Sequence, residues 1–235
     1  MPMTAPLAPL VLLPGLLCDA TLWRAEIEGL ADIAAAFVPD LTLDSNVAAM
    51  AARVLAVAPE RFALGSLSMG GYVAFEIMRQ APARVERLAL FSASASPDTP
   101  AHAAERRRGM ASLKLGRFVG VGQHLLPQLI HPSRLADPVA ETVRDMAERV
   151  GGTAFLKQQE AILSRPDSRP VLAEIGVPTL VAVGDSDVLT PPAEARIIHE
   201  GIRGSTLHVL ETCGHLPALE RPEECTALLR DWLTA

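Results

Sequence analysis

A serine flanked by small residues is the clearest chemical signal in this chain. The segment SLSMGG at 66–71 follows an apolar run and precedes a helical pattern at 69–82. A serine on so tight a strand-to-helix turn takes a strained backbone conformation, so the residues two before and two after it must be small. Ser66 and Gly70 meet that need, although G-x-S-x-G has glycine where Ser66 stands. We predict that Ser68 is a nucleophile; the alternative is that it only caps the helix.

A serine hydroxyl is a weak nucleophile and needs a base within hydrogen-bond reach. Of the six histidines, only His215 follows the end of a predicted strand, in the loop TCGHLP at 212–217. Reactive groups of open parallel sheets gather at the carboxyl edge. We therefore predict that His215 is the general base; the alternative is a loop histidine that meets only solvent.

The carboxylate that orients this histidine should follow the preceding strand. The loop GDSDVLTP at 184–191 offers Asp187, which we favour, and Asp185, which stays open as an alternative. The order Ser68, Asp187, His215 is the serine–acid–histidine order of one hydrolase fold and differs from the orders of chymotrypsin-like and subtilisin-like proteases.

Acyl transfer also needs N–H donors for the oxyanion that forms on the carbonyl. We expect one donor to be the backbone N–H of Met69, directly after the nucleophile. We assign the second to the backbone N–H of Leu16, with Leu17 as the fallback, because Gly15 lets that loop approach closely.

Alternating strand and helix patterns must hold these residues in place. The strand segments are apolar throughout, which is typical of a parallel sheet that is covered on both faces. We predict strands at 8–13, 33–40, 61–68, 87–94, 178–185 and 205–212, and helices at 18–30, 45–58, 69–82, 191–202 and 221–233.

The middle of the chain has a different pattern. No strand is predicted from about 97 to 170, and helical spacing recurs at 121–130, 139–150 and 154–163. We therefore expect an α/β core made of residues 1–96 and 171–235, with residues 97–170 inserted as a helical cap.

Composition limits the possible functions. The 235 residues are 49% hydrophobic with a net charge of −6, which suits one globular α/β domain and argues against nucleic-acid binding, because no basic stripe is present. The N-terminal segment lacks a basic region and has prolines in its apolar run, so we interpret it as a first strand and not a signal peptide. No stretch approaches the roughly 18 apolar residues of a membrane span. The three scattered cysteines are too few for a disulfide framework or a zinc site and favour a cytoplasmic protein. We expect a monomer or homodimer with no metal or cofactor.

Four motifs in this order resemble those of the α/β-hydrolase superfamily: Leu13-Pro14-Gly15 as the oxyanion loop, with proline where histidine is usual, the elbow at 66–70, the acid loop at 184–191, and Gly214-His215 followed by ERPE at 220–223. The resemblance favours Asp187 over Asp185. It implies a mostly parallel sheet of about six strands, without the first two strands of the family, and a cap after the sixth family strand. Similar branches are small bacterial carboxylesterases, pimeloyl-carrier-protein methyl ester esterases, enol-lactonases and cofactor-free haloperoxidases.

The expected reaction is acyl transfer on small carboxylic esters or lactones. The same triad could serve perhydrolysis, thioester cleavage or C–C bond hydrolysis, and an alternative of another class is a non-catalytic ligand-binding module. For the substrate pocket we predict Leu17, Phe118, Leu126, Leu189 and Leu216. The run Arg106-Arg107-Arg108 could meet an anionic substrate, but such a run is more often a solvated helix face.

Overall fold

Six parallel strands form the sheet. The computed structural model describes residues 7–116, 118 and 120–235, and its strands lie in the order β2-β1-β3-β4-β5-β6. Every neighbouring pair is parallel. The strands are β1 (Ala8–Leu13), β2 (Ala34–Phe37), β3 (Phe62–Leu67), β4 (Val85–Phe91), β5 (Thr179–Gly184) and β6 (Thr206–Leu210). The predicted six-stranded parallel sheet is confirmed, and each strand begins and ends within three residues of its predicted bounds.

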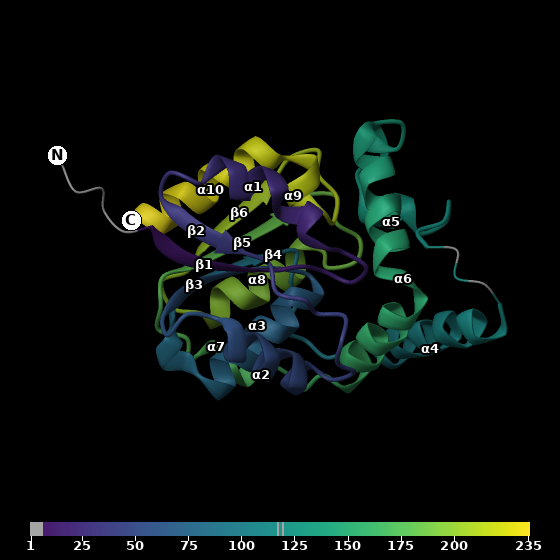
Figure 1. The fold of residues 1–235 in the computed structure, drawn as a ribbon, viewed down its shortest axis with the longest axis horizontal. Helices are drawn as coiled ribbons and strands as arrows, with labels where there is room; N and C mark the ends of the chain where they lie inside the picture. Colours follow the sequence, from purple (N-terminus) through teal and green to yellow (C-terminus); the bar gives the residue numbers. More distant parts are fainter. Residues whose placement is uncertain (1–6, 117, 119) are drawn as a thin grey trace.

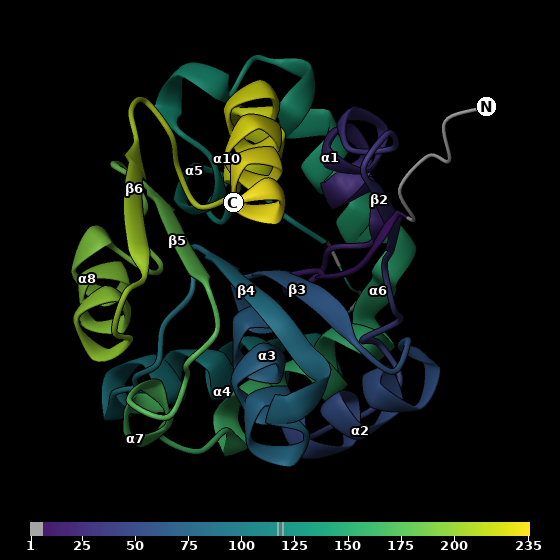
Figure 2. The ribbon, with the colours of Figure 1, turned by 90° about the vertical axis from the view of Figure 1, so that its left-hand side faces the viewer.

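Both faces of the sheet are covered by helices, as the apolar strands require. The helices of the core are α1 (Arg24–Gly29), α2 (Val47–Val57), α3 (Met69–Gln80), α8 (Pro192–Gly201) and α10 (Pro222–Thr234), with the shorter η1 (Ala20–Trp23), η2 (Pro82–Arg84), α7 (Arg169–Leu172) and α9 (Pro217–Glu220). Val11 and Leu13 of β1 belong to a hydrophobic cluster with α2, α3 and α8. Leu10 and Leu12 alternate to the other face and pack with α10. Figure 2 shows α1 and α10 on one side of the sheet and α2 and α3 on the other.

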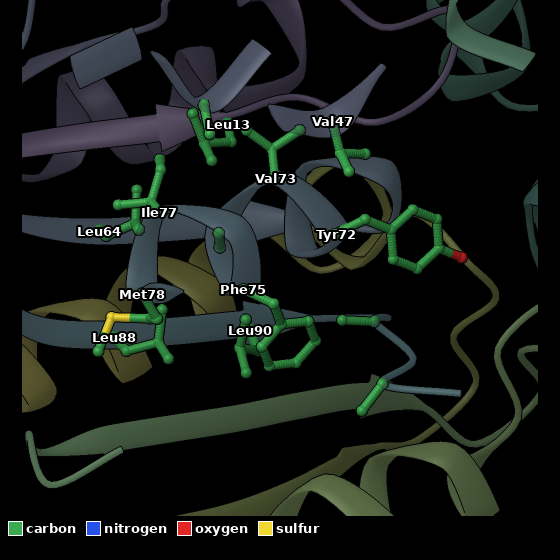
Figure 3. Close-up of a cluster of buried hydrophobic side chains, with 14 of the residues drawn as sticks. Leu13, Val47, Leu64, Tyr72, Val73, Phe75, Ile77, Met78, Leu88 and Leu90 are labelled. Carbon is green, nitrogen blue, oxygen red and sulfur yellow. The ribbon is translucent and has the colours of Figure 1, made fainter. Parts of the chain in front are cut away.

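Helix α3 lies close against the strands that precede and follow it. Nine of its twelve residues are buried, and Figure 3 shows Val73 and Ile77 beside Leu13 and Leu64. A Cβ added at Gly70 would stand 2.5 Å from the carbonyl oxygen of Leu13. The glycine therefore sets the distance between the start of α3 and the end of β1, which is where the predicted nucleophile is held.

The segment between β4 and β5 is helical in its described residues. It contains α4 (Pro100–Leu115), α5 (Leu126–Leu129), η3 (Pro132–Arg134) and α6 (Pro138–Ser164), which Figure 1 shows grouped at one end of the sheet. Gly151 has a φ of 77° and kinks α6 between the two helices predicted at 139–150 and 154–163. Helix α4 was not predicted, because its apolar residues form no clear stripe. The exact division into core and cap stays a prediction.

The cap is tied to the loops of the core by polar contacts from α6. Arg149 donates from Nε to Oδ2 of Asp19 at 2.7 Å and from Nη2 to the hydroxyl of Thr21 at 2.9 Å. Lys157 donates to the carbonyl oxygen of Leu43 at 3.0 Å. In residues 7–116, 118 and 120–235, no helix is both long enough and apolar enough to cross a membrane.

One acidic residue is buried on α1 without a partner. Glu26 has no exposed surface, and neither of its carboxylate oxygens has a hydrogen-bond partner among the described residues. Burial raises the pKa of this carboxyl to about 8, because the charged form loses its hydration. The neighbouring indole N–H of Trp23 is also without an acceptor in the described part of the chain.

The pKa of Glu26 predicts a pH-dependent stability. The folded protein binds the proton of Glu26 more tightly than the unfolded chain does. The contribution of this proton to the free energy of unfolding is therefore fully present below the unfolded pKa near 4.5 and is lost as pH rises to about 8. We expect Glu26→Gln, which cannot ionise, to raise the free energy of unfolding at pH 9 by up to about 5 kcal/mol, with a much smaller difference at pH 5.5. Urea denaturation at several pH values measures this.

The matched control is Glu28→Gln, which removes an exposed carboxylate from the same helix. It should leave the pH profile of stability unchanged. A stability difference between Glu26→Gln and the wild-type protein that stays constant from pH 5.5 to pH 9 would contradict an ionisable buried Glu26.

Candidate active site

The three predicted catalytic side chains meet at the carboxyl edge of the sheet. Ser68 follows β3, Asp187 follows β5 and His215 follows β6. Nε2 of His215 lies 2.8 Å from Oγ of Ser68, and its Nδ1 lies 2.8 Å from Oδ2 of Asp187. Asp187 and His215 are 3% and 4% exposed, so the contact between them is shielded from water. The imidazole thus lies between a hydroxyl and a carboxylate, with one ring nitrogen facing each.

The backbone of Ser68 is in a conformation that few non-glycine residues adopt. Its φ is 55° and its ψ −114°, and its side chain makes no capping hydrogen bond to α3. The hydroxyl is therefore turned away from the helix and is available to His215. Ser66, two residues earlier, is completely buried and donates its hydroxyl to the carbonyl oxygen of Ala89 at 3.2 Å. A serine is accepted at this position because its single polar group is satisfied.

The carboxylate of Asp187 accepts several hydrogen bonds from its own loop and from His215. Its Oδ1 accepts the backbone N–H groups of Leu189 and Thr190, both at 2.9 Å. Burial raises its pKa, but the charge and hydrogen bond of His215 and the hydrogen bonds from Thr190 outweigh burial and hold the pKa below its ordinary value. The group is therefore a carboxylate near neutral pH, which fits an acceptor for the Nδ1 proton of His215.

Thr190 is a site residue that the sequence analysis missed. Its hydroxyl lies 2.8 Å from Oδ2 of Asp187, 2.8 Å from the carbonyl oxygen of Ser92 and 3.2 Å from Nδ1 of His215. A hydroxyl three residues after an acceptor carboxylate is a known local motif and could have been noticed. Thr190 connects the acid loop to the loop that follows β4.

Asp185, the alternative acid, does not contact the imidazole. It accepts hydrogen bonds from the backbone N–H groups of Thr212 and Cys213 at 3.0 and 3.1 Å and from the hydroxyl of Ser186 at 2.9 Å. Thr212 has a φ of 54°, so this carboxylate holds a strained turn at the start of the histidine loop.

A second buried carboxylate holds the other side of the histidine loop. Glu220 is 1% exposed, and its Oε1 accepts the backbone N–H groups of Gly214 and Leu216 at 3.0 and 3.3 Å. The backbone N–H of His215 itself donates to the carbonyl oxygen of Leu129 in the cap at 3.1 Å. Backbone donors on both sides of His215 are thus satisfied, which fixes the direction of the imidazole. Glu220 was noticed only as part of the family motif at 220–223.

The loop after β1 contains the second predicted oxyanion donor, Leu16, and its fallback Leu17. Leu17 has a φ of 59°, and its backbone N–H donates to Oε1 of Gln158 at 3.1 Å. The fallback donor is therefore already used. The backbone N–H groups of Leu16 and Met69 have no acceptor in the described part of the chain. Their assignment as the oxyanion donors stays a prediction, and this pattern supports Leu16 over Leu17.

Gln158 is buried on α6 and has no exposed surface. While its Oε1 accepts from Leu17, its Nε2 donates to the carbonyl oxygen of Leu41 at 3.2 Å. One amide of the cap therefore joins the loops that follow β1 and β2. No local sequence pattern identified this glutamine, because all its partners are more than 100 residues away.

A cavity of about 270 Å³ opens above the nucleophile. Of the predicted pocket residues, Leu17, Leu189 and Leu216 line it. Phe118 and Leu126 are not among the described residues that line it. Phe118 packs against Phe155 with ring centroids 6.0 Å apart, and Leu126 is 3% exposed within the hydrophobic core, so both side chains make packing contacts, and their part in the pocket stays a prediction. The described residues of its wall are Gly15, Leu16, Leu17, Cys18, Leu67, Ser68, Tyr72, His102, Glu105, Arg106, Val121, Leu125, Gln128, Leu129, Val143, Met146, Ile162, Val188, Leu189, Thr190, His215 and Leu216.

This arrangement can carry out base-assisted nucleophilic attack. His215 can accept the proton of Ser68 through Nε2 while Asp187 holds the proton on Nδ1. Within the residues that the structure describes, no group of three or more His, Cys, Asp or Glu side chains is placed to hold a metal ion.

Because Asp187 contacts His215 itself and Asp185 contacts the loop before that histidine, we expect their substitution to affect different properties: activity for Asp187 and stability for Asp185. We expect Asp187→Asn to lower the kcat of hydrolysis by about 10³–10⁴-fold, because an amide cannot hold the required imidazole tautomer. Asp185→Asn should leave kcat within about threefold of the wild-type value and should lower the thermal midpoint, because it weakens the bonds to Thr212 and Cys213. Steady-state kinetics and thermal denaturation of both variants test this. A larger loss of kcat in Asp185→Asn than in Asp187→Asn would reverse the assignment.

The hydrogen bond from Leu17 to Gln158 leads us to expect that the cap positions the oxyanion loop. We expect Gln158→Leu to lower kcat by about 10–100-fold with little change in KM, since loss of an oxyanion donor costs about 10²–10³-fold and here the donor is only displaced. The control is Lys157→Ala, which removes a neighbouring contact from α6 to the loop after β2 only, leaves the loop after β1 untouched and should keep wild-type kcat. Equal losses in the two variants would point to a general effect of loosening the cap.

Comparison with known proteins agrees with this geometry. Residues 10–228 match the Alpha/beta hydrolase family. A pimeloyl-[acyl-carrier protein] methyl ester esterase of Neisseria meningitidis serogroup C is 31% identical over 71% of the chain and 67% of its own length; for the serogroup A protein that last share is 55%.

Solved structures show the same relationship. A thermophilic esterase from Thermogutta terrifontis, with malate bound, is 32% identical with a TM-score of 0.89, covering 98% of this chain and 91% of its own. The enol-lactonase from Burkholderia xenovorans shares the fold at 23% identity and a TM-score of 0.83, covering 99% and 94%. The family predicted from the four motifs is confirmed: the chain belongs to the Alpha/beta hydrolase family, in its branch of small esterases.

Proposed function

We propose that the protein hydrolyses small carboxylic esters or lactones through an acyl-enzyme intermediate on Ser68. The observation that carries the proposal is the 2.8 Å contact between Nε2 of His215 and Oγ of Ser68, with Nδ1 held 2.8 Å from Asp187. This hydrogen-bonded chain ends in a cavity of about 270 Å³, a size that suits a small substrate. Names of esterases among the relatives support the same reaction class.

In the first half of the reaction, Oγ of Ser68 attacks the carbonyl carbon while its proton moves to Nε2 of His215. The carbonyl oxygen becomes an oxyanion, for which the backbone N–H groups of Leu16 and Met69 are the proposed donors. Asp187 stabilises the imidazolium through Nδ1. The tetrahedral intermediate then collapses, and His215 returns the proton to the leaving alcohol oxygen, which leaves an acyl ester on Ser68.

In the second half, water takes the place of the alcohol. His215 removes a proton from the water, whose oxygen attacks the acyl carbon, and the same proton is then delivered to Oγ of Ser68 as the acid departs. In a lactone the leaving hydroxyl stays attached to the acyl part, so a single hydroxy acid is released.

Substitution of the nucleophile tests the proposal. We expect Ser68→Ala to lower kcat for p-nitrophenyl acetate by at least about 10⁴-fold while the protein stays folded, because no other attacking group remains. A fluorophosphonate should add to the wild-type protein at Ser68, identified by peptide mass, and should not label the variant. The control Ser45→Ala changes an exposed serine before α2 and should keep full activity. Undiminished ester hydrolysis by Ser68→Ala would refute the role of the residue, whereas a wild-type protein that neither hydrolyses esters nor reacts with the fluorophosphonate would favour a non-catalytic binding module.

A further inference from the structure

Two polar side chains on the wall of the cavity have unused hydrogen-bond donors. Tyr72 and Arg106 line the same cavity as Ser68, and neither takes part in the proposed acyl transfer. Tyr72 comes from α3, one turn after the nucleophile, and Arg106 comes from α4 in the cap.

The ring of Tyr72 is held firmly while its hydroxyl stays free. The residue is 6% exposed, and the guanidinium of Arg165 lies over its ring, 4.2 Å from the centroid. The hydroxyl has no hydrogen-bond partner among the described residues. Figure 3 shows the hydroxyl pointing away from the apolar cluster that surrounds Val73 and Phe75.

The guanidinium of Arg106 is fixed by two contacts. Its Nε donates to Oδ2 of Asp98 at 2.7 Å, and its Nη1 donates to Oε1 of Gln159 at 3.1 Å. Its Nη2 amino group has no acceptor within the residues that the structure describes. The side chain is 26% exposed, whereas Arg107 and Arg108 are exposed residues, so the expected solvated face applies to those two and not to Arg106.

The charge at this wall favours an anion. Asp98 is shared by two guanidiniums, because Arg165 also donates to its Oδ1 at 2.8 Å. Asp98 is therefore one carboxylate between two guanidiniums, of which only Arg106 lines the cavity. The carboxylate of Glu194 also lies near Tyr72, where it accepts the hydroxyl of Ser94. Glu105 also lines the cavity, but its side chain is 71% exposed and lies 3.8 Å from Arg108, so solvent screens much of its charge.

We propose that Tyr72 and Arg106 bind a carboxylate on the acyl part of the substrate, away from the ester that is cleaved. Two oxygens of a carboxylate can accept from Nη2 of Arg106 and from the hydroxyl of Tyr72, and charge-assisted hydrogen bonds of this kind are strong. The apolar side chains of Leu125, Val143 and Met146 line the same cavity and suit a chain of methylene groups. The preferred substrates are then half-esters of dicarboxylic acids. This inference rests on the proposed ester hydrolysis.

The test compares monomethyl esters of succinate, glutarate and adipate with the neutral dimethyl esters of the same acids. The wild-type enzyme should have a higher kcat/KM for the half-ester of at least one chain length. Arg106→Met should lower that kcat/KM by about 20–100-fold and leave the diester within about threefold, because only the anion loses its partner. Tyr72→Phe should lower kcat/KM for the half-ester by about fivefold. Arg107→Met, which removes an exposed arginine one residue along α4, should have no effect.

The ratio between half-ester and diester separates a binding role from a structural one. Equal losses on both esters in Arg106→Met, or a wild-type preference for diesters at every chain length, would overturn the subsite while Ser68-dependent hydrolysis stands. Calorimetric binding of glutarate tests the subsite even if no ester is turned over. Binding that weakens in Arg106→Met and not in Arg107→Met supports the subsite, and glutarate binding that is absent or equal in all three proteins contradicts it.

Discussion

The backbone strain at Ser68 is the constraint on which the site depends. A non-glycine residue with a φ of 55° and a ψ of −114° costs on the order of 1–3 kcal/mol and persists only when its surroundings hold it. Those surroundings are the buried helix α3, which follows directly, and β3, whose six residues are all buried. Gly70 lets the start of α3 lie against the end of β1. The strain is thus balanced by packing of the whole central sheet, and its result is a hydroxyl turned out of the helix toward His215.

Three acids have different roles around that hydroxyl: Asp187 and Glu220 are buried, and Asp185 is exposed. Asp187 is rich in donors and keeps a lowered pKa, which suits a permanent charge beside the imidazole. Asp185 and Glu220 accept backbone N–H groups on either side of His215, so they fix the loop and not the ring. Burial raises the pKa of Glu220, since its partners are neutral backbone donors and not a cation. The position of His215 is therefore determined by the loop, and its tautomer by Asp187.

Local sequence patterns predicted the strands, the helices of the core and the catalytic loops, but they missed most of the residues that hold those loops in place. Six apolar strand segments, the small residues around Ser68 and the two loops at 184–191 and 212–217 can each be recognised within about ten residues. Thr190 has a local signal that was overlooked. Gln158 has no local signal, because its partner Leu17 lies 141 residues away, whereas Glu220 accepts from Gly214 and Leu216, only six and four residues before it, and was noticed only within the family motif. Phe118 and Leu126 were expected in the pocket because they are apolar cap residues, but apolarity alone does not distinguish a cavity wall from the contact between cap and core.

The cap is part of the reaction site as well as its cover. Gln158 accepts the N–H of Leu17, and the carbonyl oxygen of Leu129 accepts the N–H of His215, so cap residues bond to both the oxyanion loop and the histidine loop. Breaking such a buried bond leaves an unsatisfied polar group and costs about 1–3 kcal/mol. A change in the cap that shifts α6 would therefore alter the rate of the chemical step as well as the choice of substrate. We expect selectivity and turnover to be coupled in this molecule, because α6 lines the cavity and also holds Leu17, the residue next to the proposed oxyanion donor Leu16.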